Sequence, residues 1–253
     1  MALAEIPSGL PTAVIGTPYF AWRLRRNREG WDGPGRVGEI VGDSAVVRLG
    51  FRTGNGGGRM SADLDRAHAI LRRIGDGVRG CKVEVLRGRI VMSPVRPFHK
   101  RTAFALWEML ERRLGTERRC IGGVGISFAA EATELRPDVA VIPASEEERN
   151  LETYPPGIVD LAVDVVTPGS AIRDHADRRR MYAEADVPVH AVFDPYAARC
   201  EFMSDPRDGA YSSRREFAYG EQVPVPGPFR ETVIDTSVLP IDPGKEAGPT
   251  PPG

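Results

Sequence analysis

The strongest constraint on the fold is an alternation of short strand patterns with two helical patterns, running from Lys82 to Pro195. Residues 82–94 alternate apolar side chains about Arg87-Gly88, which is typical of a β-hairpin. Further strand patterns lie at 118–128, 137–143, 158–168 and 187–195, and helical patterns at 99–114 and 170–185. This order predicts an α/β fold in which a mixed β-sheet is flanked by helices.

The helical pattern at 99–114 suggests which side of the first helix is buried. Five apolar side chains fall largely on one helical face, namely Phe104, Leu106, Trp107, Leu110 and Leu114. We expect this face to pack on the sheet. Residues 199–239 read as edge strands and turns.

The two ends of the chain differ in composition from the middle. Residues 1–59 are rich in Gly and Pro and end near the linker-like run GNGGG at 54–58. Residues 61–74 resemble a helix, and one hypothesis is that Met60 is the true start and residues 1–59 an extension. We predict one domain over 60–240 and a disordered Pro/Gly tail over 241–253.

The overall charge limits how the chain could bind nucleic acid. Lys and Arg total 34 against 35 for Asp and Glu, so the net charge is −1. A protein that binds nucleic acid through overall charge is usually basic, so binding here requires a local patch. Candidate patches are Arg112-Arg113, Arg118-Arg119 and Arg178–Arg180. Each is equally compatible with a solvated helix face.

Several classes of protein and site are disfavoured by what the sequence lacks. The three cysteines, Cys81, Cys120 and Cys200, are far apart and form no C-x-x-C pair, which argues against a zinc site and a disulfide framework. No apolar run approaches the roughly 18 residues that a membrane span requires. No phosphate-binding G-x-x-x-x-G-K-[ST] loop occurs, so we expect no nucleotide cofactor. A cytoplasmic protein fits these observations.

Two carboxylates stand out because they lie at or inside apolar strands. Asp138 precedes one strand, and Asp164 is inside another, between Val163 and Val165. Burying an unpaired charge is costly, so such acids need a reason. If the strands are neighbours, the carboxylates converge and would bind a hard cation such as Mg²⁺ or Mn²⁺. Alternatively, Asp138 ends a turn and Asp164 forms a buried ion pair with a helix arginine.

The helix at 170–185 carries polar residues on one face. Asp174, Arg178 and Tyr182 are spaced by four residues and therefore share that face. A guanidinium beside paired acids can orient a phosphate and stabilise its developing charge. The alternative is a simple Asp174–Arg178 pair on the helix surface, and the two interpretations are compatible.

Four blocks in this order resemble a known family. VEVLRGRIVMSP, RPDVAVIP, DLAVDVVTPGSAIRD and RRRMYAEADVPVHAVFDP are similar to the Uma-type family of restriction endonucleases, in the PD-(D/E)XK nuclease superfamily. The resemblance covers about 63–239. It implies metal ligands at Asp138 and Asp164, with the backbone carbonyl of Val165 completing them.

The resemblance also implies a catalytic residue on the helix and two supporting residues. The superfamily lysine falls on Arg178, and the strand acid, usually Glu, is Asp164, so the chain departs from the pattern twice. Glu84 matches an acid at the hairpin and would lie at the edge of the metal site. His99 matches a histidine that opens the first helix, where it would contact phosphate or serve as a cap or surface group.

Two functions follow as expectations. The first is an Mg²⁺-dependent endodeoxyribonuclease that hydrolyses DNA phosphodiester bonds, with a homodimer as the form that reaches both strands. The second is a catalytically weak or inactive nuclease-like domain that binds nucleic acid or a protein partner. Arg at position 178 favours the second, because Arg is bulkier than Lys and does not lose its proton. Retention of both acids favours the first.

Overall fold

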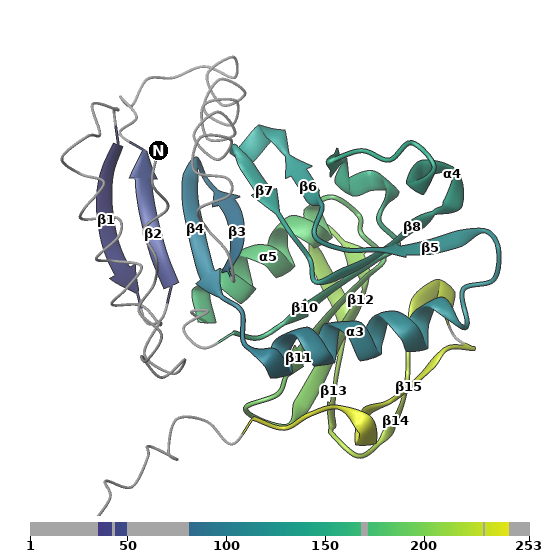
Figure 1. The fold of residues 1–253 in the computed structure, drawn as a ribbon. Coiled ribbons are helices and arrows are strands. Elements are labelled where there is room, and N and C mark those ends of the chain that lie inside the picture. Colours follow the sequence, from purple (N-terminus) through teal and green to yellow (C-terminus); the bar gives the residue numbers. More distant parts are fainter. Residues whose placement is uncertain (1–34, 42–43, 50–80, 168–171, 230, 243–253) are drawn as a thin grey trace, which may run out of the picture.

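The computed structural model describes residues 35–41, 44–49, 81–167, 172–229 and 231–242, with backbone alone for 35–41, 44–49 and 172–174 (Figure 1). The helices are α3 (Pro97–Glu111), α4 (Ala144–Glu147) and α5 (Ile172–Glu184). The strands in the first half are β1 (Gly35–Val41), β2 (Ser44–Leu49), β3 (Cys81–Leu86), β4 (Arg89–Pro94), β5 (Arg118–Ile121), β6 (Gly125–Phe128) and β7 (Thr133–Leu135). Those in the second half are β8 (Val139–Pro143), β9 (Thr153–Tyr154), β10 (Leu161–Val165), β11 (Val189–Asp194), β12 (Arg199–Arg207), β13 (Ala210–Ala218), β14 (Gln222–Pro224) and β15 (Val233–Asp235).

A six-stranded sheet forms the centre of the molecule, in the order β13-β12-β11-β10-β8-β5. Strands β10 and β11 are parallel, and α5 connects them, whereas the other neighbours are antiparallel. A parallel pair needs such a crossover, because a tight turn can join only antiparallel strands. The predicted mixed sheet with flanking helices is confirmed (Figure 1).

A second sheet carries the hairpin, in the order β1-β2-β4-β3-β7-β6-β9. Arg87 and Gly88 have φ values of 49° and 70°, the left-handed pair that a two-residue hairpin turn requires. The predicted hairpin about Arg87-Gly88 is therefore confirmed. Strands β1 and β2 come from the first 59 residues and join this sheet through pairing of β2 with β4. The predicted helix at 61–74 lies outside the described residues.

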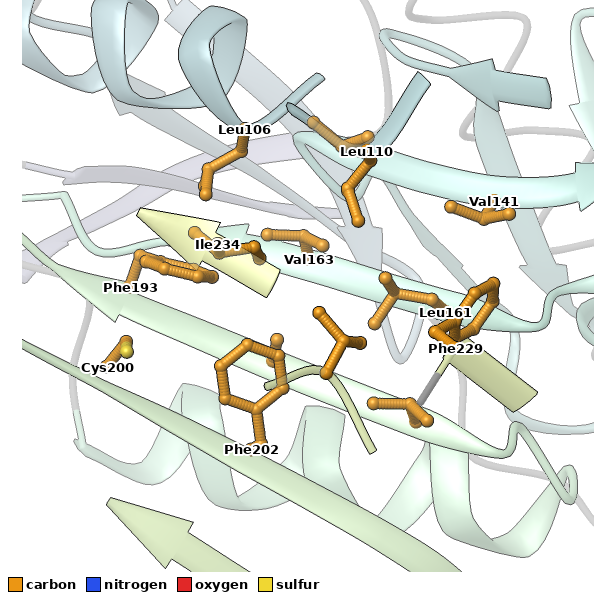
Figure 2. Packing of buried hydrophobic residues seen from close by; sticks show 14 of the residues in the cluster. Leu106, Leu110, Val141, Leu161, Val163, Phe193, Cys200, Phe202, Phe229 and Ile234 are labelled. Atoms are coloured by element: carbon orange, nitrogen blue, oxygen red, sulfur yellow. The ribbon is translucent and has the colours of Figure 1, made fainter. Parts of the chain in front are cut away.

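The core forms on both faces of the six-stranded sheet, because its central strands project apolar side chains from both faces. Leu106 and Leu110 of α3 pack on one face against Val141, Leu161, Val163 and Phe193 (Figure 2). On the opposite face, Ala140, Ile142 and Ala162 cluster with Met181 and Tyr182 of α5. Burial on both faces explains why β8 and β10 are almost continuously apolar. A charged residue in either strand therefore has little access to water.

One expectation about α3 is wrong. Phe104 was predicted on the buried face, but its side chain is 66% exposed. The other four predicted residues do face the core, because Leu106, Leu110 and Leu114 are buried and Trp107 packs against them. The buried stripe also includes His99 and Thr102, which are polar because this end of the helix reaches the charged residues described below, so the apolar pattern alone did not place the stripe completely. Among the described residues, no helix is long and apolar enough to cross a membrane.

Candidate active site

Asp138 and Asp164 meet at one end of the six-stranded sheet. Strands β8 and β10 are antiparallel neighbours with Val139 opposite Val163, which places the two acids side by side just beyond that pair. The Asp138 amide donates to the Val163 carbonyl at 2.8 Å. The Asp138 Oδ2 atom accepts from the Val165 amide, also at 2.8 Å. The backbone thus fixes Asp138 against the strand that carries Asp164.

Lys82 lies between the two carboxylates. Its Nζ atom is 3.1 Å from Asp138 Oδ2 and 3.2 Å from Asp164 Oδ1. The side chain comes from β3, in the other sheet, and is 12% exposed. A single cation therefore lies between two acids and reduces their mutual repulsion.

Arg178 of α5 connects Asp164 to Glu84. Its Nη1 atom donates to Asp164 Oδ1 at 3.1 Å, and its Nη2 atom donates to Glu84 Oε2. Glu84 Oε1 accepts from the Arg136 amide at 2.7 Å. Because all three side chains are almost fully buried, the pairing of Asp164 with a helix arginine, one of the alternatives above, is present. It coexists with the shared cation of Lys82.

Two histidines hold the outer oxygens of the carboxylates. His99 Nε2 is 2.8 Å from Asp138 Oδ1, and His190 Nε2 is 3.1 Å from Asp164 Oδ2. An ionised carboxylate only accepts hydrogen bonds, so each Nε2 carries the donated proton. Neither Nδ1 atom has a hydrogen bond among the described residues. Tyr182 packs beside His190, with 4.8 Å between ring centroids.

The charges around the site fix the protonation of its groups. Burial alone would raise the pKa of Asp138 and Asp164, but Lys82, Arg178 and the histidine hydrogen bonds outweigh burial and hold both pKa values below the ordinary range. Burial would likewise lower the pKa of Lys82, yet the surrounding carboxylates raise it above its ordinary value. The acids are therefore ionised and the lysine charged at neutral pH.

Asp138 and Asp164 are the side chains that could hold a divalent cation. A pocket beside Asp164 is lined by Lys82, Glu84, Ser93, Asp164, Val165, Thr167, His175 and Arg178. Carboxylate oxygens of Asp138 and Asp164 already share one cation, so both are directed at one point, and hard oxygens of this kind suit Mg²⁺ or Mn²⁺. In the described part of the chain, no three His, Cys, Asp or Glu side chains are grouped as metal ligands. Protein ligands would then be the two aspartates and backbone oxygen.

The structure brings together most of the residues singled out in the sequence. Those that lie in or against the cluster are Glu84, His99, Asp138, Asp164, Val165, Arg178 and Tyr182. His99 is 3% exposed and points at Asp138, so its position does not support a phosphate contact or a surface role. Asp174 belongs to α5, but its side chain lies outside the description.

Two members of the cluster were not predicted, namely Lys82 and His190. His190 could have been found by the signal that revealed Asp164, because it too is a polar residue inside an apolar strand, β11. Lys82 gives a weaker signal, since a lysine in a hairpin is usually solvated. Only its spacing of two residues from Glu84 places both side chains on one face of β3.

The arginine clusters are largely paired with acids. Arg179 contacts Glu201 at 3.5 Å, and Arg180 pairs with Glu131 and Glu184. The remaining pairs are Arg112–Glu108, Arg118–Asp160 and Arg119–Glu111. These arginines offer less positive charge to a phosphate backbone than the sequence suggested.

Comparison with known proteins agrees with this geometry. Residues 75–237, more than half of the chain, match the model of the Uma2 family, described as putative restriction endonuclease. The chain belongs to the Uma2 family. The resemblance of the sequence to this family of nuclease-like proteins is therefore confirmed, together with a fold of the PD-(D/E)XK type.

A solved structure shares the fold of this Uma2 chain. It is a crystal structure, at 1.96 Å resolution, of a putative nuclease belonging to DUF820 from Anabaena variabilis. The two superpose with a TM-score of 0.51 and 15% identity over 62% of this chain and 88% of the other. No curated protein matches this chain.

Proposed function

We propose that the protein is a divalent-metal-dependent endodeoxyribonuclease that uses Mg²⁺ or Mn²⁺ to hydrolyse DNA phosphodiester bonds. The observation that carries this proposal is the convergence of Asp138 and Asp164 on one point, at the end of two otherwise apolar strands, β8 and β10. The acids and their partners are costly to bury, and a fold of this kind does not need them there for packing. Restriction-endonuclease-like families generally use divalent metal ions.

Asp138 and Asp164 would hold the metal, with the carbonyl of Val165 as a further proposed ligand. A bound metal of this type activates water and stabilises charge on the transferring phosphate. His99 and His190 hold the outer oxygen of each carboxylate and so keep the inner oxygens directed at the metal point.

Arg178 has two tasks in this proposal. Its contacts with Glu84 and Asp164 fix the guanidinium, and Arg178 also lines the pocket. A fixed cation at the pocket wall would bind a phosphate oxygen and stabilise the charge that develops during hydrolysis. Glu84 positions Arg178 and does not reach the reacting atoms itself.

The alternative is an inactive nuclease-like domain that binds nucleic acid or a protein partner. Its specific support is that Lys82 and Arg178 already pair with Asp138, Asp164 and Glu84, so two cations offset most of the buried negative charge without a metal. Cleavage assays separate the two functions.

Plasmid cleavage with Mg²⁺ or Mn²⁺ tests the proposal. We expect nicking or linearisation by the wild type and a loss of at least about 100-fold in Asp138→Asn and Asp164→Asn, since each removes a ligand charge. Asp208→Asn is the matched control, because Asp208 is exposed in the turn after β12 and its left-handed backbone suits Asn. Equal activity in all four proteins would indicate a contaminating nuclease, and no activity in the wild type would leave the inactive-domain alternative.

A further inference from the structure

Lys82 occupies the point at which the two carboxylates converge. Its ammonium contacts one oxygen of Asp138 and one of Asp164 at nearly equal distances of 3.1 and 3.2 Å. Asp164 Oδ1 also accepts from Arg178, and Asp138 Oδ2 from the Val165 amide. The inner oxygens are thus already fully engaged by protein donors.

A divalent cation bound to these same oxygens would lie against the Lys82 ammonium. Two positive charges at contact distance repel strongly in a buried site, where water screens them little. The oxygens also have no spare lone pairs on the inner side while Lys82 is in place. Metal and ammonium therefore exclude each other from this point.

The pocket offers the displaced ammonium a place. Lys82 and Glu84 lie on the same face of β3, and Ser93 is opposite Lys82 on β4, and all three residues line the pocket. A four-carbon stem allows the ammonium to move into the pocket without movement of the strand. There it would face the same space that the proposed function assigns to the DNA phosphate.

We propose that Lys82 competes with the metal for the two aspartates. The Lys82 ammonium binds both carboxylates when no metal is bound, and it moves into the substrate pocket when a divalent cation binds. The proposal rests on the proposed function, because it takes metal binding to Asp138 and Asp164 as given. It adds that one side chain exchanges a role in charge balance for a role in phosphate binding. Lys82 would thus make DNA binding in the pocket depend on prior metal binding.

Titration of Mn²⁺ into Lys82→Met and wild-type protein, followed by calorimetry, tests the competition. We expect Lys82→Met to bind Mn²⁺ at least about tenfold more tightly, because the removed charge opposes the metal directly. Arg87→Met is the matched control, because it removes one positive charge from the same hairpin. The Arg87 side chain is 59% exposed and pairs with Asp177, away from the two aspartates. This variant should bind Mn²⁺ as the wild type does. Equal or weaker binding by Lys82→Met overturns the competition.

Cleavage distinguishes this role from a merely structural one. Lys82→Met should lose activity at saturating Mn²⁺ while its metal affinity rises, whereas a structural defect would lower both. If the wild type binds Mn²⁺ and cleaves DNA but Lys82→Met binds no more tightly, the competition fails and the nuclease stands. If neither protein binds Mn²⁺, the competition and the metal-dependent function fail together.

A measurement on the wild type avoids the risk that Lys82→Met does not fold. Acetylation of lysines with acetic anhydride, read by mass spectrometry, should label Lys82 slowly without metal, because its ammonium is buried and doubly paired. Mn²⁺ should increase the labelling of Lys82 at least about threefold, on the expectation that loss of both ion pairs exposes a side chain. Labelling of the exposed Lys100 should not change. An unchanged or lower rate at Lys82 contradicts the displacement.

Discussion

At the scale of single residues, the site is a chain of alternating charges. The ion pairs run in the order Glu84, Arg178, Asp164, Lys82 and Asp138. These residues come from β3, α5 and β10 and from the position just before β8. Each charge has lost most of its hydration, so its neighbours must replace the water. Removing one member leaves its partners buried with less counter-charge.

The loss of Arg178 should therefore be expensive in stability. Arg178→Met leaves Glu84 and Asp164 without their shared guanidinium, and we expect the free energy of unfolding to fall by about 3–5 kcal/mol. Arg178→Lys should recover only part of this loss. It restores the positive charge, but one ammonium lacks the planar fork of donors by which the guanidinium reaches both acids. Arg180→Met is the control on the same helix and should cost less than about 1 kcal/mol, since Arg180 forms its pairs at the surface. Urea unfolding measures all three, and equal losses for Arg178→Met and Arg180→Met would contradict the buried network.

The part of the site that could be predicted is the part whose residues violate their local pattern. Asp138 and Asp164 are visible in the sequence because acids are rare in apolar strands. Lys82 violates nothing locally, since a lysine on a hairpin strand is ordinary. Its role depends on the packing of β3 over the end of the other sheet, a long-range contact that no local pattern encodes.

At the scale of elements, turn chemistry and apolar runs are enough to place most strands. The hairpin was predictable because Arg87-Gly88 separates two alternating segments, and β8, β10 and β11 because each is a short apolar run. The face of α3 was less predictable. Its buried stripe begins with His99 and Thr102, whose burial depends on Asp138 and on the helix backbone rather than on hydrophobicity.

The corrected face of α3 has a direct test. Leu106→Ala should lower the free energy of unfolding by about 2–5 kcal/mol, because Leu106 is fully buried against the sheet and truncation leaves a cavity. Phe104→Ala, on the same helix, should change it by less than about 0.5 kcal/mol, because Phe104 is 66% exposed. Thermal or urea unfolding of both variants decides the matter. A larger loss for Phe104→Ala than for Leu106→Ala would contradict the exposed position of Phe104.

At the scale of the whole molecule, a net charge of −1 makes any binding to DNA depend on where positive charge is free. Most of the arginine clusters are paired with acids. Lys100 and Arg101 are different, because both are exposed and, within the described residues, neither forms an ion pair. They follow His99 on α3, so they lie on the outer side of the helix end that reaches the site.

This placement predicts that Lys100 and Arg101 contact the DNA backbone. Each phosphate contact contributes about 0.9 to the slope of log binding constant against log salt concentration, because it releases counterions. We expect the double substitution Lys100→Gln and Arg101→Gln to weaken binding of a short duplex and to reduce this slope by about 2. Arg199→Gln is the control, since Arg199 is on β12 and pairs with Glu216, and its slope should equal that of the wild type. Fluorescence anisotropy at several salt concentrations measures the slopes, and an unchanged slope in the double variant would place the DNA on another surface of the molecule.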